Sequence, residues 1–133
     1  MKQALRRLSI LSIVLTDVGG CLSGDLPELA PVTGKVTLDG KPIKTGLISF
    51  VPDPARGTDG TPGIGNIDEN GTYRITTLEA DGAQVGFHKV RAYVLAGGVP
   101  AIPERYLDPE TSGLTFEVKA GQDNVFDVEL KGR

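Results

Sequence analysis

The chain is poor in the residues that carry most catalytic and metal chemistry. It has one cysteine, one histidine and no tryptophan among 133 residues, and it contains no H-E-x-x-H or C-x-x-C motif. One cysteine, Cys21, excludes an internal disulfide framework, and one imidazole, His88, leaves a single candidate base for a nucleophilic triad. The sequence therefore predicts no catalytic residue, no metal site and no cofactor, and we expect a protein that is not an enzyme.

Basic charge and long apolar runs are also scarce. The formal net charge is −3, and without its first 20 residues the chain carries 11 basic and 16 acidic residues, a net charge of −5. This composition lacks the basic footprint that nucleic acid requires, so we expect no nucleic-acid partner. No stretch approaches the roughly 20 apolar residues that span a bilayer.

The N-terminus has the layout of an export signal. Lys2, Arg6 and Arg7 form a positive segment, and residues 8–15 form a short, mainly apolar run. Such a run fits the hydrophobic region of a signal peptide and is too short for a membrane span. We therefore predict that residues 1–20 address the chain for export.

The motif Val18-Gly19-Gly20-Cys21 resembles the lipobox of bacterial lipoproteins. The resemblance implies that Cys21 becomes the lipidated N-terminus, with acyl chains such as palmitate that together give stable anchoring. Asp17 departs from the lipobox pattern, because apolar or small residues are usual there. A plain secretory signal that is cut elsewhere, or an uncut N-terminal anchor, is the alternative interpretation.

Composition divides the rest of the chain into a spacer and one domain. Residues 21–31 contain two prolines, a glycine and two acids without a regular period, which predicts a flexible tether. Residues 32–133 have the length of a single domain and no cysteine, so its stability must come from an apolar core. The predicted locations are extracytoplasmic and membrane-anchored, at the outer membrane or facing the periplasm.

From residue 32 onward the pattern is that of an all-β domain. Apolar and polar residues alternate in short runs that are separated by Gly, Pro, Asn and Asp. Seven strands are expected, at 32–38, 46–51, 64–67, 72–77, 88–94, 114–119 and 126–130. Both faces of 46–51 are partly apolar, which indicates a central strand, and Asp39-Gly40 and Asn70-Gly71 are turn signals. Seven short strands in roughly 100 residues predict a two-sheet sandwich.

Acidic residues near the second turn raise a calcium interpretation. Asp68, Glu69 and Asn70 lie together, and Asp53 and Asp59 occupy a neighbouring loop. The order of these residues is not that of an EF-hand, and a hairpin turn explains Asn70 and its following glycine. We therefore predict a turn at this position and no metal site.

Four segments carry a resemblance to a known family. The segments GKVTLDGKPIKTGLISFVP (34–52) and DENGTYRI (68–75) resemble the carboxypeptidase regulatory-like domain, a transthyretin-like (prealbumin-like) fold. IPERYLDPETSGLTFEV (102–118) and AGQDNVFDVEL (120–130) resemble exported lipoproteins of planctomycete-type bacteria. The resemblance implies a seven-stranded Greek-key β-sandwich without peptidase chemistry. The 5-hydroxyisourate hydrolases share this fold, but their several histidines and C-terminal Tyr-Arg-Gly-Ser are missing here.

Two functions from different classes follow from the sequence, with a hydrolase as a distant third. The first is a non-catalytic, lipid-anchored sandwich with a structural or protein-interaction role at the cell envelope. The second is a glycan or small-ligand binding module that uses the loops 52–63 and 96–112. Tyr106 is the candidate ligand contact in the second loop, although its ring could instead fix that loop to the sandwich. His88 and Tyr93 lie on one strand, where His88 faces the core and Tyr93 faces away.

Overall fold

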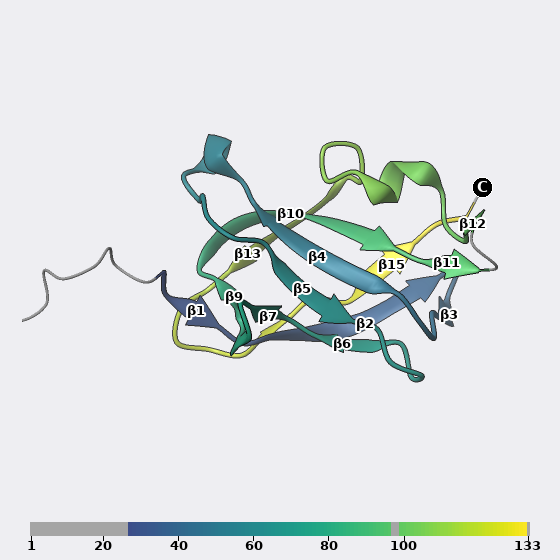
Figure 1. The fold of residues 1–133 in the computed structure, drawn as a ribbon, viewed down its shortest axis with the longest axis horizontal. Coiled ribbons are helices and arrows are strands. Elements are labelled where there is room, and N and C mark those ends of the chain that lie inside the picture. The colour runs from purple at the N-terminus through teal and green to yellow at the C-terminus, as the bar shows by residue number, and fades with distance from the viewer. Residues whose placement is uncertain (1–26, 97–98, 133) are drawn as a thin grey trace, which may run out of the picture.

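The computed structural model describes residues 27–96 and 99–132, which form an all-β sandwich of two main sheets (Figure 1). This confirms the predicted fold class. The strands of the larger sheet, in spatial order, are β13 (Leu114–Val118), β10 (Gly86–Tyr93), β4 (Leu47–Pro52), β5 (Gly63–Asn66), β7 (Thr76–Thr77) and β8 (Ala80–Asp81). The smaller sheet contains β2 (Val32–Leu38), β3 (Lys41–Pro42), β6 (Thr72–Arg74), β14 (Asn124–Val125) and β15 (Val128–Leu130).

Short elements complete the described chain. Two further pairs lie outside the main sheets: β1 (Leu29–Ala30) with β9 (Ala83–Gln84), and β11 (Leu95–Ala96) with β12 (Val99–Pro100). Two 3₁₀ turns, η1 (Pro54–Arg56) and η2 (Glu104–Leu107), lie in the two long loops. The described residues thus hold more strand segments than the seven expected, because alternation over two residues is too short a signal to read. The Greek-key connection remains a prediction.

The larger sheet is antiparallel throughout, and β4 lies inside it. β4 pairs with β10 on one side and with β5 on the other. The central position predicted from the two apolar faces of this strand is therefore confirmed. Its inward residues Ile48 and Phe50 have no exposed surface.

The C-terminal strand pairs with β2 in parallel, in two pieces. β14 matches Asn124 to Val32, and β15 matches Val128 to Val36. Between the pieces the Lys35 amide donates to the Asp127 carboxylate at 3.0 Å, and the Tyr73 hydroxyl donates to the Phe126 carbonyl. Two side chains thus satisfy backbone groups where the ladder is interrupted.

The expected strand 72–77 passes from one sheet to the other. Its first part, β6, pairs with β2, and its second part, β7, pairs with β5. Ile75, between them, donates its amide to the Val32 carbonyl at 3.0 Å and has no exposed surface. The predicted alternation holds across the switch, since Tyr73, Ile75 and Thr77 are all buried.

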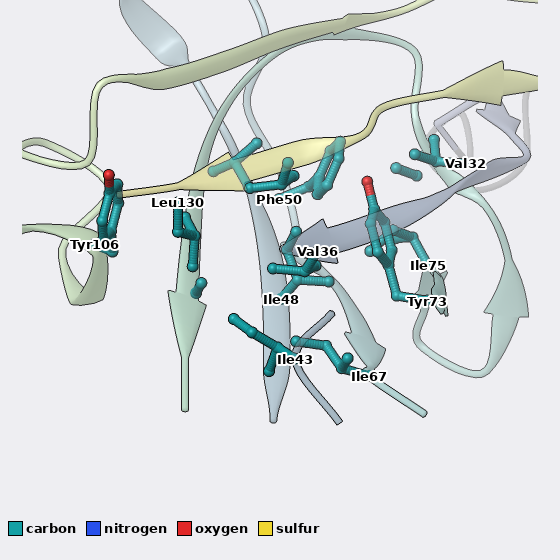
Figure 2. Packing of buried hydrophobic residues seen from close by; sticks show 14 of the residues in the cluster. Val32, Val36, Ile43, Ile48, Phe50, Ile67, Tyr73, Ile75, Tyr106 and Leu130 are labelled. Atoms are coloured by element: carbon teal, nitrogen blue, oxygen red, sulfur yellow. The ribbon is translucent and has the colours of Figure 1, made fainter. Parts of the chain in front are cut away.

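The core fills the space between the two sheets (Figure 2). Phe50 is its centre: its ring centroid lies 6.3 Å from that of Tyr73 and 5.8 Å from that of Phe116. Val32, Val36 and Leu130 approach from the smaller sheet and are at most 1% exposed. Burial of side chains of this size contributes about 1.5–3 kcal/mol each before chain entropy is subtracted.

The predicted tether 21–31 needs a correction at its end. Leu29 and Ala30 form β1, paired with Gln84 and Ala83, and Ala30 is only 2% exposed. Pairing and burial fix the backbone of these residues, so they belong to the domain and not to a spacer. Residues 21–26 of the predicted tether lie outside the described residues.

Candidate functional site

The two sheets present different outer faces. The outward residues of β2 are polar and partly or fully exposed: Thr33, Lys35 and Thr37. The outer face of the larger sheet instead carries apolar side chains, with Leu47 39%, Ile64 48% and Tyr93 47% exposed. Single exposed apolar residues are ordinary, but a contiguous group of them marks a candidate interaction surface.

These apolar residues line one groove across three strands. The groove has a volume of about 270 Å³ and is lined by Leu47, Ser49, Ile64, Arg91 and Tyr93. Tyr93 on β10 lies directly opposite Leu47 on β4, and Ser49 lies opposite both Arg91 and Ile64. Ser49, only 7% exposed, is the smallest of the five, and it forms the floor between larger neighbours. We call this feature the sheet groove.

The glycines of β5 explain why this strand turns its isoleucine outward. Gly63 and Gly65 occupy the inward positions, so Ile64 faces the groove. A Cβ at Gly65 would lie 2.8 Å from the Arg74 carbonyl oxygen and 3.1 Å from the Ile75 side chain. The chain that crosses between the sheets therefore takes the space beneath β5. Only glycine fits on that side, and the apolar side chain of the strand is left on the other.

The charges on the outer face of the larger sheet are arranged unevenly. Lys89 forms an ion pair with Glu110 at 2.7 Å, and the Arg56 guanidinium stacks on the Phe87 ring at 3.9 Å from its centroid. Hydrogen bonding to Glu110 raises the pKa of Lys89. Arg91, which lies in the sheet groove, has no ion pair among the described residues.

His88 lies in the core, as its position in the alternation predicted. It is 1% exposed, its ring centroid is 5.8 Å from that of Phe50, and its Nε2 donates to the Gln84 carbonyl at 2.7 Å. Its Nδ1 is buried and has no hydrogen-bond partner among the residues that the structure describes. Burial lowers the pKa of His88, so the ring is neutral near pH 7.

Tyr106 does not present its ring to solvent, which corrects its candidacy as a ligand contact. It is 4% exposed, and Figure 2 shows it at one end of the core, beside Leu130. Its hydroxyl accepts from the Lys131 amide at 2.9 Å and from the Arg105 guanidinium at 2.7 Å. The ring therefore fixes the long loop to the C-terminal strand, which was the alternative interpretation of this residue.

Two of the acidic residues considered for calcium, Asp53 and Asp68, lie apart from each other, and each accepts hydrogen bonds within its own turn. Asp53 follows β4 and Asp68 follows β5. Because β4 and β5 are antiparallel neighbours, the two aspartates lie at opposite ends of these strands. Asp68 accepts the amides of Asn70 and Thr72 at 2.8 and 3.0 Å, and these hydrogen bonds, with that of the Thr72 hydroxyl, lower its pKa. Within residues 27–96 and 99–132, no group of three or more His, Cys, Asp or Glu side chains is placed to hold a metal ion.

The two long loops begin at different ends of the larger sheet. The loop 52–63 follows β4 and the loop 96–112 follows β10, and these two strands are antiparallel neighbours. They therefore leave the sheet at opposite ends, as the positions of β4 and of the β11–β12 pair in Figure 1 show. The glycan or small-ligand interpretation that uses these two loops stays a prediction.

Cys21 and its lipobox-like motif lie outside the described residues. In the part of the chain that the structure covers, no helix has the length and apolar character to cross a membrane. Comparisons with protein-family models, with curated proteins and with solved structures give no match for this chain. The sheet groove is the candidate site, and the alternation in the sequence placed two of its residues, Arg91 and Tyr93, on the outward face of their strand.

Proposed function

We propose that this protein is a non-catalytic, lipid-anchored β-sandwich that binds a protein partner at the cell envelope through the sheet groove. The observation that carries this proposal is the exposure of Leu47, Ile64 and Tyr93 side by side on a rigid central part of the larger sheet. Apolar side chains exposed together on a packed sheet gain free energy when a partner covers them.

The position of the groove relative to the N-terminus supports this role. The chain enters the domain at β1, whose Leu29 pairs with Gln84, two residues before β10 begins. Tyr93 lies at the other end of β10, about 23 Å away at 3.3 Å per residue. A domain anchored through Cys21 would therefore hold its groove away from the anchored end, where a partner has access.

The anchoring part of the proposal is tested by labelling. Cells that express the full-length chain are fed labelled palmitate, and wild type is compared with Cys21→Ser. We expect label on wild type and none on the variant, with the variant released from the membrane fraction. Equal labelling of both proteins would contradict lipidation at Cys21.

The binding part is tested by capture from solubilised envelope. Wild type is compared with Tyr93→Asp, which places a charge in the groove, and with Val125→Asp, which makes the same kind of change at a 62% exposed residue of the smaller sheet. We expect a partner band with wild type and with Val125→Asp that is absent with Tyr93→Asp. The same bands with all three proteins would contradict a role for the groove.

The resemblance to the carboxypeptidase regulatory-like domain is consistent with this proposal, because that module has no catalytic centre of its own. Glycan binding keeps one supporting observation, the exposed ring of Tyr93, since a sugar C–H face stacks on such a ring. The groove offers that ring only Ser49 and Arg91 as polar neighbours. Its mainly apolar lining favours a protein side chain over a sugar.

A further inference from the structure

The sheet groove combines an apolar wall with one charged side chain that forms no ion pair with any residue that the structure describes. Leu47, Ile64 and Tyr93 form the apolar part, and Arg91 is the one charged lining residue. Two other cations on this outer face are engaged, Lys89 with Glu110 and Arg56 with the Phe87 ring. Among residues 27–96 and 99–132, the Arg91 guanidinium has no ion-pair partner.

A guanidinium beside apolar surface has a defined chemical complement. It presents a rigid fork of N–H donors that matches a carboxylate in a bidentate pair. The neighbouring side chains of Leu47, Ile64 and Tyr93 match an aliphatic or aromatic group. The groove volume of about 270 Å³ lies below the range of pockets that enclose whole small ligands, so it fits side chains of a chain segment.

We propose that the sheet groove docks a partner segment in which a carboxylate lies next to an apolar side chain, with the carboxylate on Arg91 and the apolar group between Leu47, Ile64 and Tyr93. This inference rests on the proposed function and names the chemistry of the partner. The charge complementarity at Arg91 is tested separately from the existence of a partner.

A second copy of this chain is a poor occupant. A two-fold contact places the same patch on both sides, so one Arg91 would face a lining whose charged member is the other Arg91. No carboxylate lines the groove to offset the repulsion. The complementarity therefore favours a foreign acidic segment over self-association through this face.

A peptide array with full-length protein in detergent tests the proposal. Four matched sets of short peptides are used: leucine with neighbouring aspartate, leucine with asparagine, leucine with lysine, and alanine with aspartate. The proteins are wild type, Arg91→Glu, Tyr93→Asp and Lys119→Glu. Lys119→Glu makes the same charge change at an exposed residue just beyond β13, and circular dichroism checks that each variant is folded.

Wild type and Lys119→Glu should bind the leucine–aspartate set about tenfold better than the leucine–asparagine set. Arg91→Glu should reverse the preference towards the leucine–lysine set, a change that loss of structure would not produce. Tyr93→Asp should bind no set.

Three results would overturn the inference. Equal binding of all leucine sets by wild type, lost in Tyr93→Asp, would remove the acidic requirement while the groove kept its docking role. A preference for aspartate that persists in Arg91→Glu would place the acid elsewhere. Binding to no peptide set, with retention of a glycan that Tyr93→Asp loses, would assign the groove to sugar. The capture experiment above decides the proposed function independently.

Discussion

Tyr73→Phe tests how the interrupted edge of the smaller sheet is held together. The Tyr73 hydroxyl donates to the Phe126 carbonyl between β14 and β15, and the neighbouring Lys35 amide is taken by Asp127. Burial, with a smaller contribution from the charge of Asp127, raises the pKa of the Tyr73 hydroxyl. The hydroxyl therefore stays a protonated donor across the physiological range.

Tyr73→Phe removes the hydroxyl and keeps the ring, and this sets the size of the change in the free energy of unfolding. The ring stays, so its packing against Phe50 is preserved and no cavity forms. The net loss of one hydrogen bond is about 1 kcal/mol, and leaving a buried carbonyl without its donor adds roughly as much again. We expect Tyr73→Phe to lower the free energy of unfolding by about 2 kcal/mol, which lowers Tm by roughly 10 °C in a domain of this size.

Thermal and urea unfolding followed by far-ultraviolet circular dichroism measures this change. Tyr93→Phe is the matched control, because it removes the same hydroxyl from a side chain that is 47% exposed. The control should change Tm by no more than about 2 °C, within the usual range for surface substitutions. If both variants unfold at the same temperature, the hydrogen bond from the Tyr73 hydroxyl does not stabilise the chain between β14 and β15.

Three further predictions concern single positions. The β7–β8 turn places Leu78 and Glu79 at positive φ, 49° and 68°, which strains both residues. The double variant Leu78→Asn, Glu79→Gly should therefore raise the free energy of unfolding by about 1–2 kcal/mol. An unchanged or lower Tm would contradict backbone strain in this turn. Gly34→Ala should prevent folding or lower the free energy of unfolding by more than about 3 kcal/mol, because a Cβ at this position would lie 1.9 Å from the Phe126 carbonyl oxygen. A soluble variant with the Tm of wild type would contradict this close approach. Burial lowers the pKa of His88 below the ordinary histidine value of about 6.5, so on acidification the unfolded chain binds a proton before the folded chain does. The free energy of unfolding should therefore fall as the pH drops below about 6.5, by at most about 1.4 kcal/mol per pH unit. Urea titrations from pH 7 to 5 should show this slope in wild type and not in His88→Gln, and equal slopes in both proteins would assign the proton to another group.

The sequence located the long strands because their alternation follows the burial of the core. β2, β4 and β10 coincide closely with expected runs, and the Asp39-Gly40 signal is a turn with both residues at positive φ, 51° and 84°. The pairing partners of each strand could not be predicted, because alternation shows which face of a strand is buried and not which sheet covers it. The switch at Ile75 and the parallel pairing of the C-terminal strand are of this kind.

The candidate site was only partly predictable for the same reason. The two apolar faces of β4 correctly indicated a central strand, but they do not tell whether both faces are covered. Leu47 is 39% exposed because no described element packs on that side. Tyr106 shows the converse, since an aromatic residue in a loop rich in proline and glycine gives no signal that its ring is buried. Exposure of an apolar residue is a tertiary property, and it decided both positions.

Photo-crosslinking in intact cells tests directly whether a partner docks in the sheet groove. A photoreactive residue replaces Ile64 in the sheet groove, or Val125, 62% exposed on the smaller sheet, in the full-length chain. We expect a discrete crosslinked partner from position 64, which is lost when Tyr93→Asp is added, and no such product from position 125. Equal crosslinking from both positions, or a product at 64 that survives Tyr93→Asp, would contradict docking at the groove.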